Sequence, residues 1–261
     1  KKEVFFKVGN EDVKLIDLPG IYNLSIGTPE ERISRNFILE EDVDVIINVV
    51  DSTSLERNLY LTALLKEMGK PMVMALNFED EFKKLDYKLN LETLEKKAIF
   101  TSGRNGAGID ELMKEAVEAF KRNQTQKQIS YKLSFDNDIE KEIDSVKEKL
   151  SKLENKEILK KYSLDWLAIK SLENDTNLFA NLKTKYGVDI SDLAKEEREN
   201  LKKRYGIDSA DVISQARYAT VKGITSMNLK RSSKNKFALT DKIDKVLLNK
   251  FGGGIVFLCI V

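Results

Sequence analysis

The sequence contains no histidine and only one cysteine, Cys259, in 261 residues. A lone cysteine cannot form a disulfide within the chain, and a zinc site built from cysteine and histidine would have too few ligands. Without histidine, the usual general base near neutral pH and the nucleophilic triads that depend on it are also excluded. Any chemistry of this chain would have to rely on positioning and electrostatics.

An excess of one charge is missing too, because 44 lysines and arginines stand against 43 aspartates and glutamates. No global field draws such a chain to nucleic acid, and we expect no nucleic-acid partner. Residues 1–6 lack an initiator methionine and an export signal and look like the middle of a strand, so we expect an internal piece of a larger protein. What the sequence does have is 41% apolar residues, enough for a packed core.

Strand and helix patterns alternate over residues 1–122, which predicts a doubly wound α/β domain. Two apolar runs around the turn formers Gly9-Asn10-Glu11-Asp12 predict an antiparallel hairpin. The β-branched run at residues 43–50 predicts a strand buried on both faces of a parallel sheet. Other strands are predicted at residues 71–76 and 98–101, and helices at 29–40, 91–97 and 109–120 and between Thr53 and Gly69.

Two of these helices begin with the spacing of a capping box. Thr28 is followed by Pro29 and Glu31, which predicts a hydroxyl cap, a proline in the first turn and a glutamate that reaches back. Thr53 and Glu56 repeat the same spacing.

The composition changes after Arg122, where a polar stretch at residues 123–128 predicts a linker. Apolar residues at helical spacing then predict a small all-helical domain over residues 123–235, with Gly187 and Gly206 as helix stops. Its helices are expected at residues 139–153, 164–172, 177–186, 191–205 and 208–227.

The last ten residues, 252–261, are apolar throughout. At about 1.5 Å per residue they would span roughly half of a hydrocarbon core, so they are too short to cross a membrane by themselves. Several lysines precede them, as on the cytoplasmic flank of a transmembrane helix. Residues 236–261 are therefore predicted to be a juxtamembrane segment and the start of a transmembrane helix, with a buried C-terminal strand as the alternative.

Three short motifs each follow a predicted strand: Asp17-Leu18-Pro19-Gly20, Asn77-Phe78-Glu79-Asp80 and Thr101-Ser102-Gly103. In this order they predict a guanine-nucleotide-binding domain. The carboxylate of Asp80 can accept two parallel hydrogen bonds from guanine, whereas adenine would leave it unpaired, which disfavours adenine by on the order of 10⁴-fold. Asn77 would bridge the base and neighbouring loops. Alone, Asn-x-x-Asp is equally typical of an ordinary turn with a helix-capping aspartate.

The two other motifs would complete the site. Backbone N–H groups around Ser102 and Gly103 would point toward the base oxygen. Asp17 would hold Mg²⁺ through a water molecule, and the N–H of Gly20 would meet a terminal phosphate. The stretch Asp17-Leu18-Pro19-Gly20-Ile21-Tyr22 is predicted to act as switch II.

A phosphate loop is missing, because Gly-x-x-x-x-Gly-Lys-Ser/Thr does not occur in the sequence. Residues 8–14 imitate its beginning, but they lack the second glycine and the hydroxyl and lead into a strand. We therefore expect this chain to be inactive in hydrolysis and to bind nucleotide weakly or not at all.

The chain resembles the cytoplasmic part of the bacterial ferrous iron transport protein B family. The most specific match is the segment at residues 51–62, DSTSLERNLYLT. Residues 17–25 with Pro29-Glu30-Glu31 are similar to the family's switch II, and Ala216-Arg217-Tyr218 with residues 239–245 to the run into its first membrane helix. Phe78 stands where many GTPases carry lysine, and Gly103 where alanine is usual.

This resemblance implies a P-loop-GTPase-like G domain without its N-terminal strand and phosphate loop (residues 1–122), a helical spacer domain (123–235) and the start of a transmembrane helix (236–261). It implies GTP or GDP and Mg²⁺ as cofactors of the intact parent, Fe²⁺ as the transported ion, and a place on the cytoplasmic face of the bacterial inner membrane. A homo-oligomer is compatible with it. The alternatives are a soluble ribosome- or tRNA-associated GTPase and a nucleotide-free scaffold domain.

Overall fold

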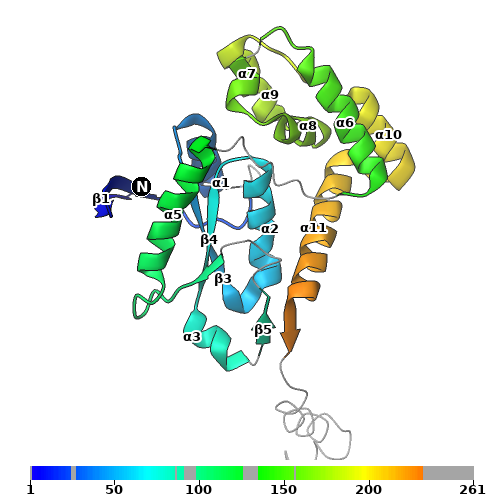
Figure 1. Cartoon of the computed structure of the whole chain (residues 1–261). Coiled ribbons are helices and arrows are strands. Elements are labelled where there is room, and N and C mark those ends of the chain that lie inside the picture. Colours follow the sequence, from blue (N-terminus) through cyan, green and yellow to red (C-terminus); the bar gives the residue numbers. More distant parts are fainter. Residues whose placement is uncertain are drawn as a thin grey trace, which may run out of the picture.

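The computed structural model describes residues 2–24, 28–85, 87–90, 98–125, 135–155 and 157–231. They form an α/β part and a helical part, which lies at the top of Figure 1. The helix predicted at residues 91–97 and the C-terminal segment 236–261 fall outside the described residues. None of the helices in the described part combines the length and apolar character needed to cross a membrane.

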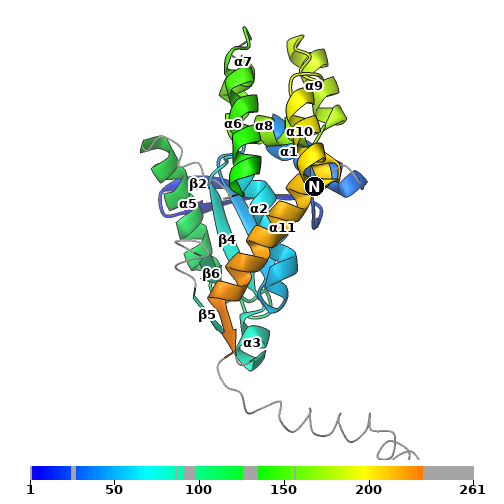
Figure 2. The same ribbon diagram turned by 90° about the vertical axis from the view of Figure 1, so that its right-hand side faces the viewer.

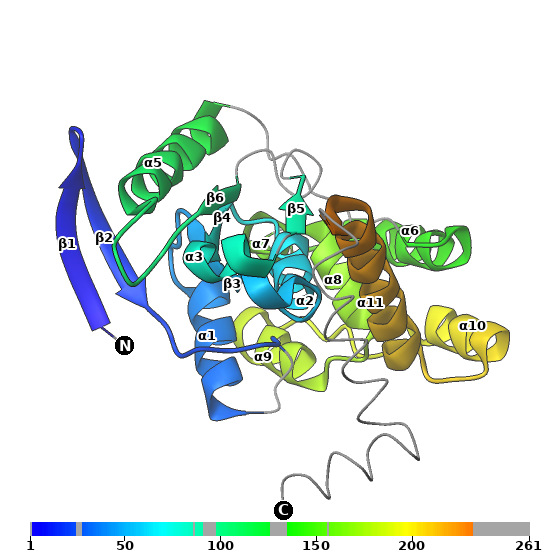
Figure 3. The ribbon, with the colours of Figure 1, turned by 90° about the horizontal axis from the view of Figure 1, so that it is seen from below.

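The chain begins with the predicted antiparallel hairpin. Its strands are β1 (Lys2–Val8) and β2 (Glu11–Asp17), and their register places Lys2 opposite Asp17. Gly9 makes the turn with a φ of 62°, a left-handed conformation that glycine adopts at little cost. Figure 3 shows this hairpin at one side of the α/β part, next to α5 (Ile109–Thr125).

The centre of the α/β part is a parallel sheet with the order β3-β4-β6. Along the middle strand, Val73 and Ala75 pack in the core under α5, whereas Met74 and Leu76 belong to the larger core on the other side. This alternation covers both faces of the middle strand, as expected for a doubly wound fold. The strands are β3 (Ile46–Asp51), β4 (Met72–Asn77) and β6 (Ala98–Phe100).

The expected burial of residues 43–50 on both faces is wrong at Val49, whose side chain is 60% exposed. The strand also begins later than predicted, at Ile46. The reason is its position: among the described strands, β3 pairs only with β4 and therefore forms an edge of its sheet.

Helix α1 (Pro29–Glu40) starts with the predicted capping box. The backbone N–H of Glu31 donates to the Thr28 hydroxyl, and the backbone N–H of Thr28 donates to the Glu31 carboxylate, each over 3.2 Å. The second capping box is wrong. The Thr53 hydroxyl donates instead to the Asp51 carboxylate over 2.6 Å. Asp51 caps a short 3₁₀ turn, and α2 (Leu55–Glu67) begins after that turn.

The helical part follows the predicted order with three differences. Helix α5 continues to Thr125, so residues 123–125 are not a linker. Helix α10 starts at Lys195 rather than at residue 191, because Asp189 accepts the N–H and hydroxyl of Ser191 in a turn. A short helix, α7, was not predicted. The helices are α6 (Asn137–Ser151), α7 (Glu157–Lys161), α8 (Leu164–Leu172), α9 (Thr176–Tyr186), α10 (Lys195–Tyr205) and α11 (Ser209–Asn228).

The two parts share one core. Helix α11 runs along α2, as Figure 2 shows, and a single apolar cluster joins Leu59 and Leu64 of α2 to Ile139 and Leu167 of the helical part. Strand β7 (Leu229–Arg231) then pairs antiparallel with β5 (Tyr87–Leu89) and returns the chain to the α/β part.

Candidate functional site

The motifs after β4 and β6 are held together by hydrogen bonds. The N–H of Gly103 donates to Oδ1 of Asn77 over 3.2 Å, and the N–H of Glu79 donates to the carbonyl of Thr101 over 3.2 Å. Because both strands are parallel neighbours, their carboxyl ends meet at the same edge of the sheet. The structure therefore brings Asn77, Asp80, Ser102 and Gly103 into one group, which we call the Asn77 group.

Asp80 lies in the first turn of the short helix α3 (Glu79–Phe82). Phe78 precedes this helix in a left-handed conformation with a φ of 62°, and the residue is 47% exposed. The Asp80 side chain is 33% exposed, and its carboxylate lies 4.0 Å from a guanidinium nitrogen of Arg104. A ligand could therefore reach this carboxylate from solvent.

The loop after β6 is tightly folded. The N–H of buried Ser102 donates to the carbonyl of Ala107 over 3.0 Å, and its own carbonyl accepts from Gly106 over 2.9 Å. The N–H groups of both Ser102 and Gly103 already have partners. The polar groups of the two motifs that remain accessible include the Asp80 carboxylate, 4.0 Å from Arg104, and Nδ2 of Asn77, for which the described residues provide no partner.

Two residues of this region were not predicted from the sequence. The hydroxyl of Ser52 donates to the carbonyl of Asn77 over 2.6 Å and fixes the end of β4 to the turn that precedes α2. Arg104 adds a positive charge beside Asp80 from a side chain that is 83% exposed. Ser52 lies in the segment at residues 51–62, but nothing in that segment predicts its contact with Asn77, and a tertiary contact of a single serine or arginine leaves no periodic signal in the sequence.

Asp17 and Gly20 lie apart from the Asn77 group in the contacts of the described residues. Asp17 ends β2, in the hairpin. The stretch that follows packs between two helices: the hydroxyl of Ser34 in α1 donates to the carbonyl of Pro19 over 3.3 Å, and the guanidinium of Arg57 in α2 lies 4.0 Å from the ring centre of Tyr22.

The residues fit a purine base better than they fit phosphates. An accessible carboxylate beside a free amide donor suits a base edge that offers two N–H donors and an acceptor. For Mg²⁺, no group of three acidic, histidine or cysteine side chains occurs among residues 2–231 as far as they are described. Asp17 is a single carboxylate, and Mg²⁺ bound by so few protein ligands depends on waters and phosphates, for which this sequence has no phosphate loop.

Two family models match the chain, one over its α/β part and one over its helical part. The family described as ferrous iron transport protein B matches residues 1–116, and the FeoB cytosolic helical domain matches residues 135–230. The chain belongs to the ferrous iron transport protein B family. The resemblance inferred from the segment at residues 51–62 is thereby confirmed.

Relatives of this family are similar over nearly the whole chain. A protein of Porphyromonas gingivalis, described as a fusion of Fe(2+) transport protein A and Fe(2+) transporter FeoB, is 35% identical and is matched over 98% of this chain and 31% of its own length. The Fe(2+) transporter FeoB of Escherichia coli is 31% identical and is matched over 100% of this chain and 33% of its own length. This chain thus spans about a third of these ferrous iron transport protein B relatives.

Among solved structures, the cytosolic domain of the T. maritima FeoB iron transporter in a GDP form is 27% identical, with a TM-score of 0.70. The likeness covers 87% of this chain and 83% of that domain. The α/β part followed by a helical part is therefore the architecture of FeoB cytosolic domains.

Proposed function

We propose that this chain is the cytosolic part of a GTP-dependent ferrous iron transporter and that its Asn77 group recognises guanine. The observation that carries the proposal is the hydrogen bond from the Gly103 N–H to Oδ1 of Asn77, which joins the loops after β4 and β6 and leaves Nδ2 of Asn77 free on the same side of the sheet as Asp80. It is supported by relatives named as Fe(2+) transporters and by a similar FeoB domain solved with GDP.

The negative charge of Asp80 would distinguish guanine from adenine. Guanine offers a ring N–H and an exocyclic amine side by side, and one carboxylate can accept from both. Adenine has an acceptor where guanine has the ring N–H, so it would leave Asp80 without a partner. Asn77 would donate through Nδ2, the ring of Phe78 would lie beside the base, and Ser102 and Gly103 would form a wall of the pocket.

The phosphate side of the site would belong to the intact parent. There Asp17 would hold Mg²⁺ through water and the N–H of Gly20 would meet the terminal phosphate, but both need a phosphate loop that this sequence lacks. We infer a G domain at residues 1–122, a helical spacer at 123–235 and a membrane-entering segment at 236–261, on the cytoplasmic face of the inner membrane. Fe²⁺ would be the cargo of the parent.

Asp80→Asn tests the proposal in a chimera that carries a phosphate-loop segment, with the Gly-x-x-x-x-Gly-Lys-Ser/Thr pattern, ahead of Lys1. An amide presents a donor to the two N–H groups of guanine, so GTP affinity should fall by on the order of 100-fold while xanthosine triphosphate, which has a carbonyl in place of the amine, gains affinity. Dissociation constants for GTP, ATP and xanthosine triphosphate are the measurement.

Asp211→Asn, an exposed substitution on α11, is the matched control and should leave all three affinities unchanged. Unchanged GTP binding in Asp80→Asn would refute the role of Asp80. A parent chimera that binds no nucleotide would instead favour a scaffold domain.

A further inference from the structure

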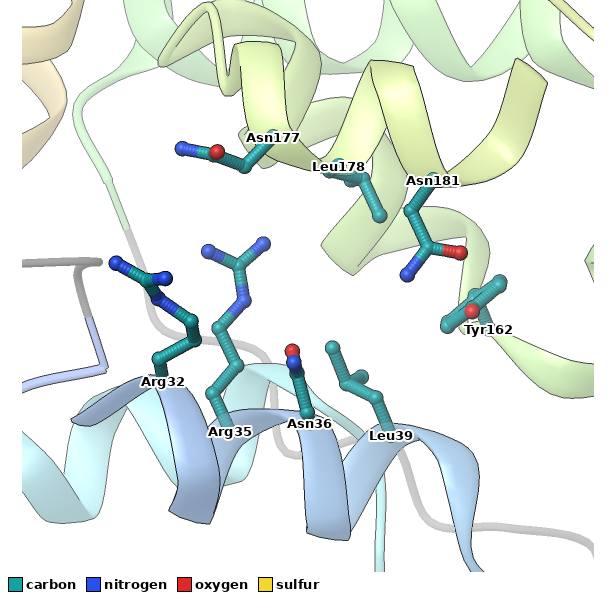
Figure 4. Close-up of a pocket in the computed structure, with 8 residues that line it drawn as sticks. All are labelled: Arg32, Arg35, Asn36, Leu39, Tyr162, Asn177, Leu178 and Asn181. Atoms are coloured by element: carbon teal, nitrogen blue, oxygen red, sulfur yellow. The ribbon is translucent and has the colours of Figure 1, made fainter. Parts of the chain in front are cut away.

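A cavity of about 240 Å³ lies between α1 and α9, at the junction of the two parts of the chain (Figure 4). None of its lining residues belongs to the Asn77 group. Its lining combines polar and charged side chains with two leucines and consists of Arg32, Arg35, Asn36, Leu39, Tyr162, Asn177, Leu178 and Asn181.

We propose that this cavity binds a small oxyanion of the phosphate class. The two arginines are three residues apart on α1, and in Figure 4 both guanidinium groups extend toward α9. Arg35 is buried and paired with Asp175 over 2.7 Å, but Arg32 has no partner among the described residues. The Arg32 side chain is exposed, so its positive charge is open to solvent at the cavity and has no counter-charge among the described residues.

An anion beside Arg32 would reduce the repulsion between the positive charges of Arg32 and Arg35. Like charges three residues apart on a helix repel each other, and Asp175 neutralises only one of them. Arginine presents a planar fork of N–H donors that matches the oxygens of phosphate or carboxylate. The amide of Asn177, in the first turn of α9, lies above Arg32 in Figure 4 and could add a further donor near the positive end of that helix.

The other end of the cavity would reject the anion. Glu40 accepts from Nδ2 of Asn181 over 3.1 Å and pairs with Lys185 over 2.6 Å, and the hydrogen bond from Lys185 lowers the pKa of Glu40, so this carboxylate is charged near neutral pH. Oδ1 of Asn181 is also a buried acceptor without a partner among the described residues. The anion is therefore expected beside Arg32 and Asn177.

The size of the cavity favours an ion over a nucleotide. Pockets for drug-sized ligands measure about 300–1,000 Å³, and this one is smaller. A bound anion would connect α1, which follows the Leu18–Tyr22 stretch, to the first turn of α9. It would stabilise the folded chain in proportion to its occupancy.

Inorganic phosphate is the probe, titrated into the whole chain at constant ionic strength with chloride as the balancing anion. We expect a saturable rise in the unfolding temperature and a saturable shift of the Asn177 side-chain amide in ¹H–¹⁵N NMR spectra. Arg32→Gln should weaken phosphate binding at least about tenfold, because a charge-assisted pair is lost.

Lys203→Gln is the matched control: it removes an exposed charge of α10 that has no partner among the described residues, and it should bind phosphate as the parent chain does. The proposal is overturned if phosphate gives no saturable shift, or if Arg32→Gln and Lys203→Gln weaken it equally, since binding would then follow net charge alone. Guanosine should not compete with phosphate, so a failure of the Asn77 group to bind guanine would leave this result unaffected.

Discussion

Arg217 is almost fully buried, at 1% exposure, although it carries a charge. Its guanidinium donates two hydrogen bonds to Glu67 of α2, over 2.8 and 3.0 Å, and one to Glu173 after α8 over 2.8 Å. Because its two carboxylate partners are themselves buried or nearly so, each charge depends on the others to remain inside the protein.

Arg217→Met should therefore destabilise the chain by about 3 to 5 kcal/mol, because it leaves the buried Glu67 without its counter-charge and Glu173 with Lys170 alone. Urea unfolding followed by circular dichroism measures the loss. Lys203→Met, on an exposed face of α10, should change stability by less than about 0.5 kcal/mol. A loss below about 1 kcal/mol in Arg217→Met would mean that water reaches the cluster and that the three charges are not interdependent.

At the scale of elements, the sequence predicted helix starts and bounds correctly where the contacts that determine them lie between neighbouring residues. The capping box at Thr28 and the bounds of α8 (Leu164–Leu172) were predicted from a few neighbouring residues, and the structure has both. The cap at Thr53 failed because Asp51, two residues earlier, competes for the same hydroxyl. Helix α7 has five residues, too few for a helical period to appear.

The same distinction applies to the candidate site. The motif residues Asn77, Asp80, Ser102 and Gly103 were found because each follows an apolar strand pattern. The contact by which Ser52 holds the end of β4 joins positions 25 residues apart and could be identified only from the coordinates. Exposure of Val49 depends on which strands flank β3, which no local pattern encodes.

The loop between β6 and α5 offers a test at this scale, because Gly106 and Gly108 have the same φ of 76° but different surroundings. A Cβ on Gly108 would overlap the carbonyl oxygen of Phe100, whereas a Cβ on Gly106 would meet no atom within 4 Å. Gly106→Ala should cost about 1 kcal/mol for the left-handed backbone alone, and Gly108→Ala more than about 2 kcal/mol.

Thermal unfolding of both variants gives the comparison, and Gly108→Ala should also displace the Ser102 amide signal in NMR spectra. Equal losses in the two variants would show that the contact with Phe100 relaxes freely and does not shape the loop.

At the scale of the whole molecule, charged contacts tie the α/β part to the helical part. Arg35 of α1 pairs with Asp175 at the start of α9, and Arg217 joins Glu67 of α2 to Glu173 of the helical part. These pairs sit beside the shared apolar core, so the two parts should unfold together rather than one after the other. Protonation of the carboxylates should then act on the stability of the whole chain.

Acid should weaken this junction through Glu173. Burial alone would raise the pKa of Glu173, but the charges of Lys170 and Arg217 outweigh it and lower the pKa to about 2. Because this value lies below the ordinary one of 4.5, the unfolded chain binds one more proton between pH 4.5 and 2. The contribution of Glu173 is thus present above pH 4.5 and is lost as the pH falls, with a slope of up to about 1.4 kcal/mol per pH unit.

Glu173→Gln should remove this slope, which is measured as the pH dependence of the unfolding free energy from 5 to 2.5, while Glu199→Gln, an exposed substitution on α10, should retain it. Burial raises the pKa of Glu67 and gives it the opposite pH dependence, and the charge of Glu173 adds to this rise. The difference between the two variants therefore reports the charge of Glu173 together with its coupling to Glu67. If Glu173→Gln and Glu199→Gln lose stability in parallel as the pH falls, the acid sensitivity arises from other carboxylates, and Glu173 does not hold the two parts together by its charge.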